Sequence, residues 1–100
     1  MGDKLAPVHP GEILLEEFLK PMGISQTHLA LCLRVPPGRI NAIVQGKRSV
    51  TADTALRLAQ FFGTSPQFWL GIQSRFDLDV ATDEIGERIA QEVRRCEAVD

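Results

Sequence analysis

The feature of this sequence that most constrains its fold is the spacing of its apolar residues. They recur three and four positions apart in short consecutive segments, and Pro, Gly, Ser or Thr separates each segment from the next. This spacing puts apolar side chains on one face of an α-helix, and the alternation that is typical of β-strands is almost absent. The sequence therefore predicts an all-α fold, a compact bundle of five helices followed by a C-terminal tail that is either helical or flexible.

Length and composition limit the classes of protein to which the chain can belong. Its 100 residues suit one domain, and the 44% hydrophobic and 24% charged residues are typical of a soluble globular protein. No apolar run approaches the roughly 18 residues of a membrane span. The first ten residues do not resemble a signal peptide, and Cys32 and Cys96 suggest no disulfide framework. We expect no contact with membranes and a reducing, cytoplasmic environment.

Start and stop signals place the first two helices. Pro10 suits a helix start, and the first helix is expected from Glu12 to Lys20, ended by Pro21 and Gly23. Ser25 is a good N-cap for the second helix, which the sequence Val35-Pro36-Pro37 breaks. Three residues form the expected inward face of this second helix: Leu29, Ala30 and Leu33.

The third and fourth helices are predicted in the same way. The third has Pro37 in its first turn, is only about eight residues long, and stops at Gly46 as a C-cap. Ser49-Val50-Thr51 opens the fourth, with Asp53 near its positive end, and Gly63 ends it. The apolar face of the fourth helix is expected to consist of Ala55, Leu56, Leu58, Ala59 and Phe62.

The last part of the chain contains a fifth helix and a polar segment. Ser65 caps the fifth helix, expected from Pro66 to about Phe76. Residues 83–96 can form a sixth helix, because apolar residues are spaced four apart there at Ile85, Ile89 and Val93. We therefore divide the chain into three parts: an N-terminal arm (1–8), a helical domain (9–81) and an acidic C-terminal tail (82–100).

The charge of the chain is strongly segregated. The formal net charge is only -2, but residues 18–52 carry five basic residues and no acidic one. Residues 76–100 carry eight acidic residues and three arginines. A solvated surface is the simpler interpretation of the basic stretch, but its position favours contact with a polyanion such as DNA.

The basic stretch coincides with a spacing typical of a helix-turn-helix, two short helices joined by a tight turn. If Gln26 is the first residue of this unit, Ala30 is the fifth, Ile40 the fifteenth and Ile43 the eighteenth. These are the positions where one small residue and two core residues are needed. The alternative is a purely structural helix pair. The sequence predicts that the second helix of the unit enters the major groove.

Side chains on or beside the exposed face of that helix have the chemistry to read base edges. Arg39 suits guanine and is our first choice, whereas Asn41 and Gln45 suit adenine. Lys47 and Arg48 follow the helix end and are better placed for phosphates, which set register and affinity. The predicted contacts with double-stranded DNA are Gln26, Pro37, Gly38, Arg39, Asn41, Ala42, Gln45, Lys47 and Arg48.

Three fragments carry a resemblance to a known family: HPGEILLEEFLKPMGIS, VPPGRINAIVQGKRSVTADTALRLAQFFGTSPQFWLGIQ and RFDLDVA. They cover residues 9–81 almost throughout, and the HPGE start and the GKRSVT joint are the more specific parts. The chain resembles the HigA-type antitoxins, within the Xre and lambda-repressor-like regulators. The resemblance implies a homodimer that binds an operator in its own operon and neutralises a RelE-like or HigB-like toxin, a ribosome-dependent mRNA endonuclease. No cofactor is expected.

Two residues depart from the family pattern. Arg34 stands where the turn of the unit usually has glycine, a position that tends to need a positive φ angle, so either modest backbone strain or a slightly altered turn is expected there. Gly38 stands where relatives often carry a larger polar or basic residue, and it removes one candidate base contact from the helix. The operator sequence therefore does not carry over from relatives.

Several other residues have a simpler interpretation beside a functional one. His28 and Cys32 are four apart, but two ligands do not make a metal site, so no metal is expected and Cys32 is expected to be a small buried residue. His9 is expected to start a helix and not to act as a catalytic base, and nothing supports an enzyme. Three large apolar residues are expected either to pack in the core or to contact a second copy of the chain in a dimer: Phe68, Trp69 and Ile72.

The leading hypothesis is a dimeric autorepressor and antitoxin that dimerises through the fifth helix, with the tail as an additional candidate contact, and that binds the toxin elsewhere. Two alternatives stay open: a toxin-inhibiting interaction module whose DNA binding is secondary or lost through Gly38, and a stand-alone Xre-type regulator. The acidic tail is either a solubilising end or a segment that binds a basic partner. A dimer is expected because each specific base contact contributes only about 1–3 kcal/mol of discrimination.

Overall fold

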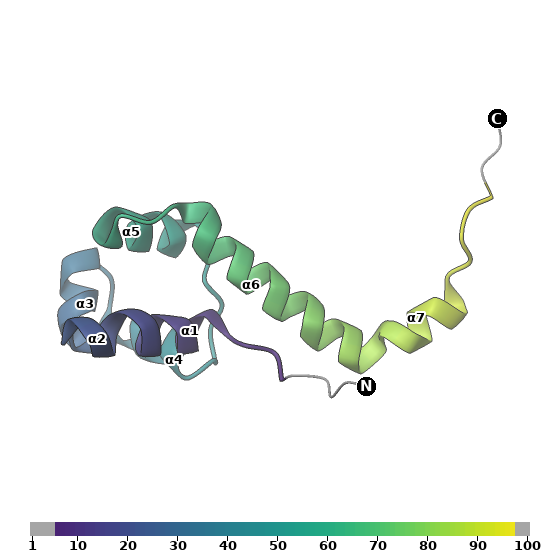
Figure 1. The fold of residues 1–100 in the computed structure, drawn as a ribbon, viewed down its shortest axis with the longest axis horizontal. Helices are drawn as coiled ribbons and strands as arrows, with labels where there is room; N and C mark the ends of the chain where they lie inside the picture. Colours follow the sequence, from purple (N-terminus) through teal and green to yellow (C-terminus); the bar gives the residue numbers. More distant parts are fainter. Residues whose placement is uncertain (1–5, 98–100) are drawn as a thin grey trace.

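A computed structural model of the chain describes residues 6–97, and every regular element in this range is helical. Figure 1 shows a compact group of short helices from which one long helix projects as an arm. The elements are α1 (Pro10–Ile13), η1 (Leu14–Leu19, a π-helix), α2 (Lys20–Met22), α3 (Gln26–Leu33), α4 (Pro37–Val44), α5 (Ala52–Phe62), α6 (Pro66–Ala81), η2 (Thr82–Gly86, a π-helix) and α7 (Glu87–Glu92). The all-α prediction is confirmed, with α1, η1 and α2 forming one continuous first helix.

The first helix is longer than predicted at both ends. It begins at Pro10 and passes through Pro21, so the prediction that Pro21 ends it was wrong. The N–H of Lys20 bonds to the carbonyl of Leu15 five residues back, and this wider turn precedes the proline. A wider turn relieves the clash between a proline ring and the carbonyl four residues before it. The helix ends at Gly23, as the second part of that prediction had it, and the φ of Gly23 is left-handed at 66°.

The N-caps of α3, α5 and α6 are the hydroxyl residues that the sequence indicated. Ser25 Oγ accepts a hydrogen bond from the N–H of His28 at 3.0 Å, and Ser65 Oγ accepts one from Phe68 at 3.0 Å. Thr51 caps α5 in the same way. Each cap satisfies an N–H group that the first turn of a helix otherwise leaves without a partner.

The core lies between the first helix and α3, α4, α5 and the start of α6. Trp69 is fully buried at its centre, and its indole N–H donates to the hydroxyl of Thr64 at 2.8 Å. The prediction for Leu56 was wrong, because this residue is 60% exposed on the outer side of α5. The buried apolar residues are Leu14, Leu19, Leu29, Ala30, Leu33, Val35, Ile40, Ile43, Val50, Ala55, Leu58, Ala59 and Trp69.

The arm arises because α6 does not stop near Phe76, where the sequence predicted its end. It continues to Ala81 and on through η2 and α7 to Glu92, so the helical alternative for the tail is confirmed over that range, and residues 98–100 lie outside the described part. The radius of gyration is 17.1 Å, against about 13 Å for a compact chain of this length. Over residues 6–97, the helices are all too short or too polar to cross a lipid bilayer.

The base of the arm is fixed to the domain by a buried amide. Gln73 is 5% exposed, and its side-chain oxygen accepts a hydrogen bond from the backbone N–H of Val50 at 2.7 Å. Its side-chain nitrogen donates to Asp77 at 2.9 Å. Because Val50 lies in the loop between α4 and α5, this amide joins the arm to that loop.

Candidate nucleic-acid interface

Helices α3 and α4 form the predicted two-helix unit. Ala30, Ile40 and Ile43 are all fully buried, as their places in the unit require. Arg34 adopts the left-handed conformation with φ 61° and ψ 46°, which confirms the positive φ expected there. The N–H of Val35 then bonds to the carbonyl of Ala30 at 3.0 Å and closes the turn.

The backbone of α4 rests directly on the first helix. A Cβ atom built on Gly11 would overlap the carbonyl group of Ile43 and lie 2.9 Å from Cα of Val44. Only a residue without a side chain allows two helix backbones to approach so closely. Gly11 therefore fixes how far α4 stands out from the domain.

The outer face of α4 presents the residues that the sequence analysis assigned to DNA. Asn41 and Gln45 are exposed, together with Pro37 and Gly38, while Ala42 is half-buried. Among the described residues, a Cβ atom built on Gly38 would meet no atom within 4 Å beyond its chain neighbours and the backbone of its own helix, so this part of the face is open. At the start of α3, Gln26 is half-buried. The face therefore presents two carboxamide side chains beside small or non-polar residues, and carboxamides can bond to base edges in the major groove.

Arg39 lies on the flank of α4, and its guanidinium group is turned back onto the protein. Its Nη1 donates to Oδ2 of Asp53 at 2.9 Å, and the side chain is only 24% exposed. Asp53 also accepts from Nε of Arg57 at 3.1 Å, and the pKa of Asp53 is lowered, chiefly by the hydrogen bond from Arg57. In this structure the arginine that was our first choice for base contact forms an ion pair with α5.

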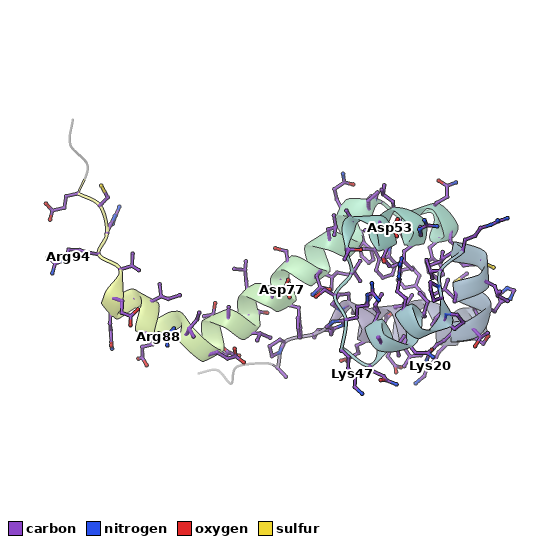
Figure 2. The ribbon with its side chains drawn as sticks, turned by 180° about the vertical axis from the view of Figure 1, so that it is seen from behind. Lys20, Lys47, Asp53, Asp77, Arg88 and Arg94 are labelled. Atoms are coloured by element: carbon purple, nitrogen blue, oxygen red, sulfur yellow. The ribbon has the colours of Figure 1, made fainter. Side chains whose placement is uncertain are left out.

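Lys47 and Arg48 lie exposed in the loop after α4. The N–H of Lys47 bonds to the carbonyl of Ala42 at 2.8 Å, which holds the start of the loop against α4. Figure 2 shows Lys20 and Lys47 along one edge of the domain, with Asp53 at the opposite edge. The basic edge therefore includes the end of α4.

His9 contacts the loop after α4 through a hydrogen bond with the backbone of Arg48. Its Nδ1 accepts a hydrogen bond from the N–H of Gly11 at 2.9 Å, so it caps the first helix as predicted, and its ring packs edge-on against Phe76 at 4.8 Å. Burial lowers the pKa of His9 below its ordinary value, although the charge of Asp77 and a hydrogen bond with the backbone of Arg48 act in the opposite direction. One imidazole thus connects the first helix, the basic loop and α6.

The remaining candidates separate into core and surface. Trp69 is a core residue, Ile72 is half-buried, and Phe68 is 40% exposed. The expectation that Cys32 is buried was wrong: it is exposed, and its Sγ lies 3.6 Å from Nε2 of His28 on the outside of α3. The roles of Gln73 and Asp53 were missed, since pairing between distant segments leaves no local pattern in a sequence.

Comparison with known proteins identifies the family. A family profile described as helix-turn-helix matches residues 15–69. The antitoxin HigA-1 of Vibrio cholerae is 41% identical over 75 residues, which make up 75% of this chain and 70% of that protein. The chain belongs to the HigA-type branch of the helix-turn-helix family. The resemblance found in the sequence is therefore confirmed.

Solved structures of HigA-type proteins have the same fold. The HigA-family addiction module antidote protein from Coxiella burnetii matches with a TM-score of 0.88 at 48% identity, covering 92% of this chain and 100% of that one. Pseudomonas aeruginosa HigA, solved with the higBA promoter, matches with a TM-score of 0.88 at 42% identity, covering 91% and 99%. This HigA-type chain is a helix-turn-helix DNA-binding protein.

Proposed function

We propose that this HigA-type chain is an antitoxin and autorepressor, which binds operator DNA of its own operon as a homodimer and neutralises a RelE-like toxin. The observation that carries the DNA half is the exposed polar face of α4 beside the basic loop at Lys47 and Arg48. The same fold is found in the Pseudomonas aeruginosa HigA that was solved with the higBA promoter, at a TM-score of 0.88.

In this proposal the contacts with DNA are of two kinds, contacts with base edges and contacts with phosphates. Asn41 and Gln45 read adenines, because a carboxamide both donates and accepts on the adenine edge in the major groove. Lys47, Arg48 and Gln26 bind phosphates and set the register of the helix. The small residues of the reading face let the α4 backbone approach the bases closely: Pro37, Gly38 and Ala42.

We assign dimerisation to the arm, because several of its apolar side chains are exposed to solvent in the single chain. Leu70 and Leu78, at 37% and 64% exposure, line one shallow groove of α6 with Ala81. Ile89 and Val93 continue the exposed apolar surface at 43% and 65%. Pairing two arms buries this surface and sets the spacing of two reading helices on a two-fold symmetric operator. Phe68 and Ile72 are further candidate contacts at the base of the arm.

We assign the toxin-binding surface to the acidic part of the same arm. Residues 76–97 carry seven acidic residues against three arginines, and Figure 2 shows Asp77, Arg88 and Arg94 following one another along it. An enzyme that cleaves RNA on the ribosome has to approach a polyanion, so a basic surface is expected on it, and an acidic helix complements such a surface. Co-purification of the chain with the product of a neighbouring short basic reading frame tests this half, and separate elution contradicts it.

A gel-shift titration against the DNA upstream of its own gene tests the repressor half. Asn41→Ala should lower affinity for the operator and leave affinity for unrelated DNA unchanged, because it removes a base contact. Lys47→Ala should weaken binding to both duplexes and flatten the salt dependence by about one unit. Absence of any retardation at low salt would contradict repression.

A further inference from the structure

Asp53 of α5 is linked to both helices of the two-helix unit, to α4 directly through Arg39 and to α3 by way of Arg57. It lies in the first turn of α5, and its Oδ2 accepts hydrogen bonds from Arg39 of α4 at 2.9 Å and from Arg57 at 3.1 Å. Arg57 in turn donates from Nη1 to the carbonyl of Leu33, at the end of α3, at 2.9 Å. The label in Figure 2 marks Asp53 on the α5 side of the domain.

The geometry of the Arg39 guanidinium group decides what it can still bind. Bidentate recognition of guanine or phosphate needs two adjacent N–H groups on one edge, either Nε with Nη2 or Nη1 with Nη2. Nη1 donates one of its two N–H groups to Asp53, and Nε is buried and has no hydrogen-bond partner among residues 6–97. The edge formed by Nε and Nη2 therefore lacks an accessible donor, and Asp53 holds one of the two N–H groups of Nη1 while the ion pair stands.

We infer that Asp53 is a positioning residue that withholds Arg39 from DNA and keeps it as a brace between α4 and α5. This inference rests on the proposed function and gives Arg39 a different role from the base contact that the sequence predicted. Discrimination between operators then falls to Asn41 and Gln45. Without the carboxylate, the cation on the flank of α4 is free to bind a phosphate and adds sequence-independent affinity.

Asp53→Asn tests the inference, because asparagine keeps the shape of the side chain and removes its charge. Binding to the operator and to an unrelated duplex of equal length is measured over a series of salt concentrations. For this variant, the slope of log affinity against log salt should steepen by about 0.9 on both duplexes, the value for one added phosphate contact. The double variant Asp53→Asn with Arg39→Gln should return to the wild-type slope.

Two single variants serve as controls. Arg39→Gln alone should leave the wild-type slope unchanged, and so should Arg57→Gln, which removes a positive charge but leaves the pair between Arg39 and Asp53 in place. Thermal unfolding of each variant confirms that the folded protein is being compared.

The outcomes separate the inference from the proposed function. A lower slope or a severalfold lower operator affinity for Arg39→Gln overturns the inference, since Arg39 then contacts DNA in the wild-type complex. An unchanged slope for Asp53→Asn also overturns it. Equal wild-type affinity for both duplexes instead contradicts autorepression, and the slopes on the unrelated duplex still decide the role of Asp53.

Discussion

Single residues carry strain in this chain, and Arg34 is the plainest case. Its φ of 61° is one that glycine adopts at no steric cost, whereas a residue with a Cβ pays about 1–2 kcal/mol. Arg34→Gly should therefore raise the free energy of unfolding by about 1 kcal/mol. The gain is smaller than the full strain because glycine also increases the backbone entropy of the unfolded chain. Urea denaturation measures this, and Arg34→Ala, which keeps the Cβ, should show no such gain. An equal gain for both variants would assign the effect to the charge instead.

His9 makes stability depend on pH. Because its pKa is lowered from 6.5 in the folded chain, the unfolded chain takes up a proton first as the pH falls, and the folded state loses stability. We expect the free energy of unfolding to fall as the pH decreases through 6.5, the ordinary pKa of the imidazole, toward the lower pKa of the folded chain. In His9→Asn, which retains an N-cap acceptor but does not titrate, this fall should be smaller. A fall of equal size in the variant would refute the assignment to His9.

At the scale of elements, the contact between the first helix and α4 depends on Gly11. Gly11→Ala should lower the free energy of unfolding by about 2 kcal/mol or more, because the new methyl group meets backbone that has no way to yield without moving α4. Gly38→Ala adds the same methyl group into open space within a helix, and should raise it by up to about 1 kcal/mol. Equal behaviour of the two variants in urea denaturation would contradict the close approach.

Local signals in the sequence were sufficient to place most helices. Ser25 and Ser65 mark helix starts because a hydroxyl satisfies the N–H groups of a first turn, and Gly23 and Gly63 mark ends because glycine adopts left-handed angles. The errors at Pro21 and Phe76 have one cause: helix continuation there depends on a wider turn and on tertiary contacts, which no local pattern encodes. The ion pair of Arg39 with Asp53 was missed for the same reason, since it joins residues fourteen positions apart.

At the scale of the whole molecule, the exposed arm predicts an association that depends on Leu78. Leu78→Glu should convert the proposed dimer to monomer, because it places a charge in the apolar surface through which we propose that two arms pair. Leu56→Glu is a matched control, since Leu56 is also a highly exposed leucine, at 60% against 64%, but lies on α5. Sedimentation velocity checks both variants, and dissociation by both or by neither contradicts an interface on the arm.

The buried amide of Gln73 divides the arm into two mechanical parts. The part of the arm up to Ala81 belongs to α6, which the hydrogen bond from Val50 to Gln73 holds against the loop that carries Lys47. The elements η2 and α7 lie beyond this attached part. A residue inserted after Ala81 turns η2 and α7 by about 100° around the helix axis, but leaves α3 and α4 in their positions in the domain. Because the exposed apolar surface of the arm runs through both parts, such an insertion should move Ile89 and Val93 out of line with Leu70 and Leu78 and so disturb the proposed pairing of arms, while the contact of Gln73 with Val50 is kept.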